Sequence, residues 1–302
     1  MENNKPLVSV IMNCYNSDTY LGEAIDSVIS QTYKNWEIIF WDNQSTDKSA
    51  EIVKSYDDER IKYFYAPSFT SLYEARNYAI EKANGEYIAF LDCDDKWYNN
   101  KIEEQLKVLE NSEYNLCYSN FYNLYENKLK KAFSSIQPSG NIFKYQIANY
   151  SIGILTVMLR KSAWDNMKEK FDKNFTYPGD LDFFIRFLYK NKAIYIDKCL
   201  CEYRADNPNS ISNTKKQNNI SQVKEAYNKL ETLFLDDTNS YEFGLYKDRV
   251  VRAEAGYFFR NKEYKKCREL INPTKFKSKK SFIVYLATFL PNFVLDFVSS
   301  RV

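Results

Sequence analysis

The chain has 302 residues, of which 44% are hydrophobic and 27% are charged, and its formal net charge is +2. These values are ordinary for a globular protein with a substantial core, and the small net charge argues against nucleic acid or another polyanion as a partner. The sequence contains no histidine, so any acid–base or metal chemistry has to depend on carboxylates.

The cysteines and the N-terminus indicate the expected compartment. The cysteines show no CxxC spacing and are predicted to be reduced thiols rather than a disulfide framework or a zinc site. They are Cys14, Cys93, Cys117, Cys199, Cys201 and Cys267. Residues 1–6 lack the apolar stretch of a secretory signal. We therefore expect a cytoplasmic protein.

The first third of the chain alternates apolar, β-branched runs with amphipathic segments. Strands are predicted at 7–13, 36–41, 61–65 and 87–91. Helices are predicted at 21–31, 48–56 and 72–83, the last with Asn84-Gly85 as its C-cap. This alternation predicts an α/β fold, a mostly parallel sheet with helices on both faces.

Polar residues follow three of these strands, around Asn13, Asp42 and Asp92. Ligands of such sheets bind beyond the carboxyl ends of the strands, so we expect these residues to share one site. No glycine-rich loop of the dinucleotide-binding or P-loop type follows any of the strands. Any phosphate must therefore be held by something other than a glycine-rich backbone.

The remainder of the chain is less regular. It predicts strands at 117–122 and 154–159, a helix at 180–189, and a charged helical region with helices at 223–235, 241–260 and 264–270. We therefore expect a catalytic domain over residues 1–215 and a helical C-terminal region over residues 216–302.

The last segment, residues 275–302, begins with several lysines and continues with an apolar, aromatic-rich stretch at 281–298. Those eighteen residues are marginal for crossing a bilayer, which needs about 20. Basic residues beside such a stretch suit a helix that lies in the headgroup region of a membrane. A helix packed on the protein or on a partner is the alternative.

The sharpest signal for chemistry is Asp92-Cys93-Asp94-Asp95 at the end of a predicted apolar strand. Neighbouring carboxylates repel one another, so this arrangement favours a bound cation. Oxygen ligands select Mg²⁺ or Mn²⁺, and such an ion commonly completes its coordination with substrate phosphates. A solvated acidic turn is the alternative interpretation.

Several further motifs occur in order around this acidic turn: Val8–Asn16, Ile25–Tyr33, Glu37–Asp47, Ala75–Asn77 and Gly85–Trp97. As a set, over about 90 residues, they closely resemble the N-terminal half of glycosyltransferase family 2, which has the GT-A fold. A weaker similarity continues through Phe171–Phe175, Gly179–Arg186 and Tyr203-Arg204.

The resemblance implies a site for a nucleoside-diphosphate sugar, with UDP as the favoured nucleotide. It implies that the nucleotide is held around Asn13, Tyr15 and the turn Asp42-Asn43, where relatives often have Asp-Asp. Arg76 matches a residue near the diphosphate, although a salt bridge on a helix surface is an alternative. Asp92 corresponds to a residue near ribose and metal, and Asp94 to the main metal ligand.

The resemblance also implies that Asp180 is the catalytic base of an inverting transfer. Inversion is a single displacement, so the acceptor hydroxyl needs a proton acceptor opposite the leaving diphosphate. Many relatives have Glu-Asp where this chain has Gly179-Asp180. A helix N-cap is the alternative role of Asp180. Asp206 stands where relatives commonly carry a histidine, and is either an oxygen ligand or part of a polar loop.

The sequence thus predicts a metal-dependent inverting glycosyltransferase that acts on a glycan or lipid-linked glycan in bacterial surface polysaccharide or glycoconjugate synthesis. Mn²⁺ or Mg²⁺ is the expected cofactor, and peripheral contact with the inner face of the membrane is expected through residues 275–302. Two alternatives remain, a sugar nucleotidyltransferase and a catalytically silent sugar-nucleotide-binding protein.

Overall fold

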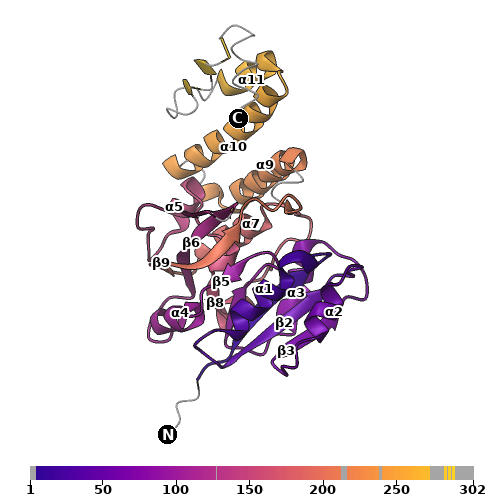
Figure 1. Cartoon of the computed structure of the whole chain (residues 1–302). Helices are drawn as coiled ribbons and strands as arrows, with labels where there is room; N and C mark the ends of the chain where they lie inside the picture. The colour runs from indigo at the N-terminus through magenta and orange to yellow at the C-terminus, as the bar shows by residue number, and fades with distance from the viewer. Residues whose placement is uncertain are drawn as a thin grey trace. The chain divides into compact units, whose positions relative to one another are not determined.

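The computed structural model describes residues 5–126, 128–211, 216–237, 240–272, 282–283, 285–286 and 288–289. The chain divides into two compact units (Figure 1), one made of Met1–Phe143 and Ser151–Asn213 and the other of Lys144–Tyr150 and Thr214–Val302. Apart from the six positions at 282–289, the segment 275–302 with its predicted membrane contact lies outside the described residues.

The first unit is built on four parallel strands in the order β3-β2-β1-β4. Their bounds are Val8–Cys14 for β1, Trp36–Asp42 for β2, Ile61–Tyr65 for β3 and Tyr87–Phe90 for β4. All of β2 and β4 is buried, as expected for strands that helices cover on both faces. The parallel strands predicted from the sequence are confirmed.

Three helices connect these strands (Figure 1): α1 (Asp18–Ile29), α2 (Ser49–Lys54) and α3 (Leu72–Glu81). Helix α1 packs against Val10 and Met12 of β1. On β2, Trp41 points to the opposite face and stacks on Tyr78 of α3, with ring centroids 5.5 Å apart. The two faces of the sheet are therefore covered by different helices, as predicted.

Further strands extend the sheet in the order β4-β8-β6-β9-β5, and β7 pairs with β6. Their bounds are Lys96–Trp97 for β5, Leu116–Tyr125 for β6, Lys128–Lys131 for β7, Met158–Arg160 for β8 and Ala193–Arg204 for β9. Strand β8 is antiparallel to both β4 and β6, and β9 is parallel to β6. Among the nine described strands, β1, β2, β3, β4, β6 and β9 therefore share one direction, which confirms a mostly parallel sheet.

Two local predictions are wrong. The strand predicted at 154–159 starts only at Met158, because Ile154–Thr156 forms a 3₁₀ turn, η1, in which the Thr156 hydroxyl donates to the Gly153 carbonyl at 2.6 Å. Helix α3 ends with Lys82 as its C-cap rather than at Asn84-Gly85. Gly85 instead permits close packing, since a Cβ there would lie 2.7 Å from the Leu7 carbonyl oxygen and the Ser9 nitrogen.

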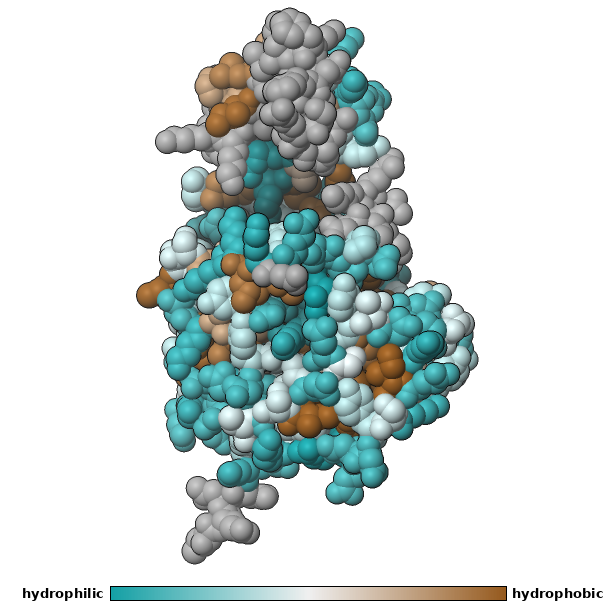
Figure 2. All heavy atoms as spheres, in the orientation of Figure 1, coloured by the Kyte–Doolittle hydropathy of each residue, from teal (hydrophilic) through white to brown (hydrophobic). Residues whose placement is uncertain are grey.

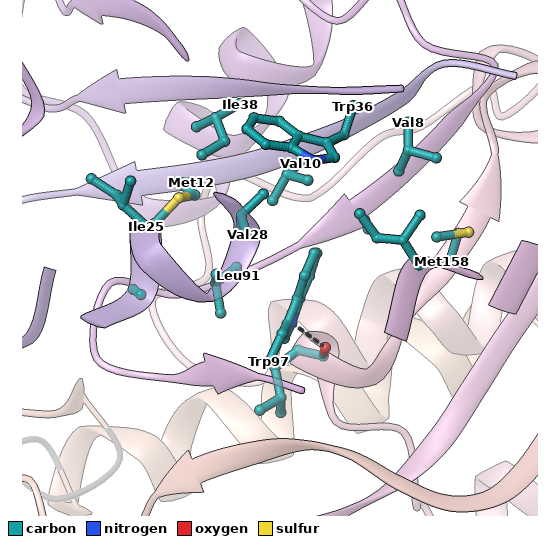
Figure 3. Packing of buried hydrophobic residues seen from close by; sticks show 14 of the residues in the cluster. Val8, Val10, Met12, Ile25, Val28, Trp36, Ile38, Leu91, Trp97 and Met158 are labelled. Atoms are coloured by element: carbon teal, nitrogen blue, oxygen red, sulfur yellow. Dashed lines mark hydrogen bonds between the residues drawn. The ribbon is translucent and has the colours of Figure 1, made fainter. Parts of the chain in front are cut away.

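A buried hydrophobic core between α1, α4 (Lys101–Leu109) and one face of the sheet holds the strand ends in place. Trp97 lies within this core and its indole N–H donates to the Leu155 carbonyl at 3.1 Å (Figure 3). Burying a side chain of this size contributes on the order of 2–3 kcal/mol. Because Trp97 lies only two residues after Asp95, the core anchors the acidic turn.

The remaining helices of the first unit are α6 (Lys161–Asp165) and α7 (Gly179–Leu188), and α7 confirms the helix predicted at 180–189. The second unit contains most of α5 (Phe143–Ala148), together with α9 (Lys216–Leu233), η2 (Leu235–Asp237), α10 (Tyr241–Arg260) and α11 (Tyr264–Ile271). Over the described residues, none of the helices has the length and apolar character needed to cross a bilayer. On the face drawn in Figure 2, the described hydrophobic residues form small separate patches among hydrophilic ones.

Candidate active site

The carboxyl ends of the parallel strands form one polar edge of the first unit. Cys14 ends β1 and Asp42 ends β2 directly beside it in the register. Asp92 follows β4, and Arg204 ends β9. The Asn43 main-chain N–H donates to the Cys14 carbonyl at 2.8 Å, so the turn after β2 stays against β1. The topology thus gathers residues that are far apart in the sequence.

Arg76 and Asp92 form an ion pair at this edge. The guanidinium Nη2 lies 2.6 Å from Asp92 Oδ1, and the Arg76 side chain is 4% exposed. The alternative of a salt bridge on a helix surface is therefore wrong for Arg76. A buried cation requires a partner, because an unpaired charge in the interior costs several kcal/mol. Helix α3 thus presents a fixed positive charge beside the acidic turn.

Asp94 and Asp95 are tied to the chain that follows β9. Asp94 Oδ2 accepts from the Asn207 amide at 2.7 Å, and Asp95 Oδ1 accepts from the Arg204 main-chain N–H at 3.0 Å. Burial raises the pKa of both carboxyls, and the charge of neighbouring aspartates raises it further. Asp95 is 3% exposed, so the acidic turn is not freely solvated.

Asp92 and Asp94 supply two ligands of the kind that Mg²⁺ or Mn²⁺ prefers. One oxygen of each accepts from another residue, and no other residue in the described part of the chain donates to the second oxygen. In the same part, no group of three or more His, Cys, Asp or Glu side chains suits a metal ion. The two carboxylates therefore fit an ion that takes its other ligands from a bound substrate or from water.

Asp42 and Asn43 are engaged within the fold. Asp42 is buried and accepts from the Tyr63 hydroxyl at 2.6 Å and from the Ser45 main-chain N–H at 2.7 Å. The Asn43 amide donates to the Thr70 carbonyl at 2.8 Å and accepts from the Thr70 N–H at 3.2 Å. Both side chains thus hold the loops beside the strand ends, and a role in nucleotide binding stays a prediction.

Asn13 and Tyr15 differ from Asp42 and Asn43. In the described structure the Asn13 side chain has hydrogen-bonding groups without a partner, and the Tyr15 ring is exposed. Both polar atoms of the Asn13 amide are buried and have no hydrogen-bond partner in the described structure. Such an unmet group costs about 1–3 kcal/mol and calls for an explanation, for which a ligand or an ion is a standard candidate. Tyr15 is 51% exposed and its ring packs against Phe69, itself 58% exposed, with centroids 4.7 Å apart.

Asp180 lies inside the first turn of α7 and not at its N-cap, because Pro178 occupies the cap position. The alternative of an N-cap role is therefore wrong. Asp180 Oδ1 accepts from the Leu181 main-chain N–H at 2.9 Å and from the Tyr73 hydroxyl at 3.5 Å. Burial raises the pKa of Asp180, and the nearby charge of Arg76 opposes that rise. Through Tyr73, whose ring centre lies 5.4 Å from the Arg76 guanidinium, Asp180 is linked to the Arg76–Asp92 pair.

Sequence reasoning missed Phe69, Tyr73 and Asn207. Tyr73 precedes Arg76 by three residues, so both lie on one face of a helix, and that spacing was an available signal. Asp206, which the sequence offered as a metal ligand or a loop residue, accepts from the Glu126 main-chain N–H at 2.7 Å. Asp206 thus links two loops, while its neighbour Asn207 reaches Asp94.

The model of Glycosyl transferase family 2 matches residues 9–173, a range that contains the ends of β1, β2 and β4 with Arg76 and the acidic turn, but not Asp180, β9 or the chain after β9. The chain belongs to glycosyltransferase family 2. It is therefore a glycosyltransferase, and the resemblance inferred from the sequence motifs is confirmed.

Two curated members of the family have informative names. The chain is 34% identical to TuaG of Bacillus subtilis, named for teichuronic acid biosynthesis, over 71% of this chain and 85% of TuaG. It is 31% identical to WfgD of Escherichia coli over 70% of this chain and 82% of WfgD. WfgD is named a UDP-Glc:alpha-D-GlcNAc-diphosphoundecaprenol beta-1,3-glucosyltransferase.

Among solved structures, TarS 1–349 of S. aureus in complex with UDP-GlcNAc matches with a TM-score of 0.64. The match covers 97% of this chain and 91% of that one, at 15% identity. This similarity supports the GT-A fold predicted from the sequence.

Proposed function

We propose that this glycosyltransferase moves a sugar from a UDP-sugar to a hydroxyl of a lipid-linked glycan, with inversion at the anomeric carbon, during synthesis of a bacterial surface polysaccharide. The names of WfgD and TuaG support the donor, the acceptor class and the pathway class. The observation that carries the mechanism is the position of Asp180, a carboxylate near the Arg76–Asp92 pair at the strand ends.

The donor nucleotide would bind at the ends of β1 and β2. Tyr15 and Phe69 offer exposed aromatic faces on which a base can stack, and the unpartnered Asn13 amide can donate to and accept from the base or ribose. Asp42 and Asn43 support this subsite by holding the adjoining loops. The diphosphate then extends towards Asp92 and Asp94.

Arg76 and the two aspartates determine how the diphosphate is held. Arg76 pairs with Asp92 through Nη2, and its remaining N–H groups would donate to phosphate oxygens. A Mg²⁺ or Mn²⁺ ion bound by Asp92, Asp94 and the diphosphate would stabilise the negative charge of the leaving group. The Asn207 amide donates to Asp94 Oδ2 and so fixes the orientation of this carboxylate. Asp94 Oδ1 would then be the oxygen that binds the metal ion.

Asp180 would accept the proton of the attacking acceptor hydroxyl. Oδ1 is held by Leu181 and Tyr73, and no other residue among those described donates to Oδ2, so this oxygen would be the one that takes the proton. The burial that raises the pKa of Asp180 makes it a stronger proton acceptor than a solvated aspartate. The sequence left a sugar nucleotidyltransferase as an alternative function. Membership of glycosyltransferase family 2 excludes this alternative.

The proposal is tested by separating donor binding from transfer. UDP binding is measured by calorimetry with Mn²⁺, and transfer is measured with UDP-glucose and a short-chain lipid-diphosphate-linked GlcNAc acceptor. Asp180→Asn should bind UDP within about two-fold of wild type while kcat falls about 1,000-fold, because a general base is lost. Asp94→Asn should weaken both UDP binding and transfer.

The control is Asp58→Asn, which changes an aspartate paired with Arg60 on the surface and should leave both quantities unchanged. The anomeric configuration of the product, read by NMR, should be inverted relative to the donor. Wild-type transfer by Asp180→Asn, or a product with retained configuration, would overturn the mechanism. UDP binding without turnover by the wild-type chain on several donors would indicate a silent binding protein.

A further inference from the structure

Tyr73 connects two helices through a contact with Asp180. It lies in the first turn of α3 and is buried, and its hydroxyl donates to Asp180 Oδ1 at 3.5 Å. The same hydroxyl interacts with the main-chain N–H of Asp180. One phenol therefore touches both the side chain and the backbone of a residue 107 positions away.

The ring of Tyr73 packs so closely against Gly179 that no side chain fits at this position. A Cβ at Gly179 would lie 2.4 Å from Tyr73 Cε2 and 2.6 Å from Cδ2, closer than real side chains approach. Gly179 is not among the described residues with positive φ, so its backbone does not need a glycine. The ring thus occupies the space that a side chain beside Asp180 would take.

The Tyr73 ring is itself held from several sides. It packs against the ring of Phe171 with centroids 5.6 Å apart, and the Arg76 guanidinium lies 5.4 Å from its centre. Arg76 in turn pairs with Asp92. Contacts therefore run without a break from Asp92 at the donor end, through Arg76 and Tyr73, to Asp180.

We propose that Tyr73 is a positioning residue for Asp180, and that Gly179 is the complementary adaptation that admits its ring. This inference rests on the proposed role of Asp180 as base. The hydroxyl engages Oδ1, so Oδ2 remains to take the proton of the acceptor hydroxyl. The groups that face Asp180 are then Tyr73, Arg76 and Asp92. Burial and the charge of Asp180 raise the pKa of the phenol, which keeps Tyr73 protonated and able to donate.

The test of the hydroxyl is Tyr73→Phe, which keeps the ring. The expected result is a fall in kcat of about five-fold with an unchanged donor KM, since one long hydrogen bond to the base is lost. The acid limb of the pH–rate profile should move to higher pH, because a hydrogen bond that stabilised the carboxylate has gone. The matched control is Tyr118→Phe, a buried tyrosine that donates to the Pro138 carbonyl, and it should leave kcat and the profile unchanged.

The test of the ring is a double-mutant cycle. Gly179→Ala should reduce kcat about ten-fold or more in the wild-type background, because the new Cβ displaces the Tyr73 ring and with it Asp180. In a Tyr73→Leu background, Gly179→Ala should reduce kcat much less. If the substitution acted only through the helix propensity of position 179, the reduction in kcat would be the same in both backgrounds.

The two proposals can fail separately. If Asp180→Asn is inactive but Tyr73→Phe retains the wild-type kcat and pH profile, the positioning role is wrong and the base stands. Additive effects in the cycle would overturn the steric relation between Tyr73 and Gly179. If Asp180→Asn transfers sugar at the wild-type rate, both the base and its positioning residue are wrong.

Discussion

The two ends of the same parallel strands differ in how completely their buried polar groups are hydrogen-bonded. At the amino end, Glu37 accepts from the Ser9 hydroxyl at 2.6 Å and from the Asn84 N–H at 2.7 Å, and it pairs with Lys62 at 2.5 Å. The Ser9 hydroxyl also accepts from the Gly85 N–H at 2.8 Å. Every member of this cluster has partners within the cluster.

At the carboxyl end, Asp42 and Asn43 are engaged within the fold, but several other polar groups are incompletely paired. The Asn13 amide has no partner in the described structure, and burial raises the pKa of Asp94, Asp95 and Asp180. At the amino end, burial also opposes ionisation of Glu37, but the bonds from Lys62, Ser9 and Asn84 prevail and its pKa is lowered. The amino end therefore stabilises the fold, whereas the carboxyl end retains binding capacity for a ligand.

The largest expected effect on stability is at the amino end, at Gly85. Gly85→Ala should lower the free energy of unfolding by about 3 kcal/mol, because the new Cβ meets main-chain atoms of Leu7 and Ser9 that cannot move independently. Chemical denaturation measures the change. Gly22→Ala is the control within α1, where the nearest atom to a Cβ is the Tyr56 hydroxyl at 3.7 Å, and it should stabilise by about 0.5–1 kcal/mol. Equal effects of the two substitutions would remove the packing argument.

A smaller effect is expected for Glu37→Gln. Because the folded pKa of Glu37 is lowered, its ionised form stabilises the fold above the unfolded pKa of about 4.3, and this contribution disappears as pH falls through the folded pKa. Glu37→Gln should cost about 1 kcal/mol at pH 7, a value reduced by the exposure of Lys62, and should flatten the loss of stability below about pH 4.3. Denaturation at several pH values tests this.

The same variant distinguishes the two ends by function. Glu37→Gln should leave kcat and the donor KM of the folded protein at wild-type values, because none of the contacts of Glu37 involves the carboxyl edge. A large fall in kcat without a loss of stability would show that the amino end also serves catalysis, and would break the comparison.

Periodicity predicted the strands that are buried along their whole length, since β2 and β4 read as continuous apolar runs. It did not predict β5, a two-residue strand that pairs with β9 far along the chain, or β7, a four-residue strand that forms a hairpin with β6, and it placed the start of β8 at 154 instead of 158. The role of Gly85 was also predicted wrongly. A glycine is needed there because the main chain at Leu7 and Ser9, at the start of β1, packs against it, and not because α3 ends there.

For the site, the sequence indicated which residues lie at the strand ends, and the parallel order brought Asn13, Asp42 and Asp92 to one edge. It did not show that Asn43 is bound to Thr70 or that the Tyr73 ring fills the space beside Asp180. Those contacts join positions that are 27 residues or more apart, and only the folded chain brings them together.

The most direct test of the account is a crystal structure of the Asp180→Asn variant with Mn²⁺ and a UDP-sugar, since this variant should bind the donor without consuming it. The uracil should stack at Tyr15 and Phe69, the diphosphate should lie beside Asp92 and Asp94, and the anomeric carbon should face position 180. Density for the donor at any other part of the chain, or a donor whose anomeric carbon faces away from position 180, would contradict it.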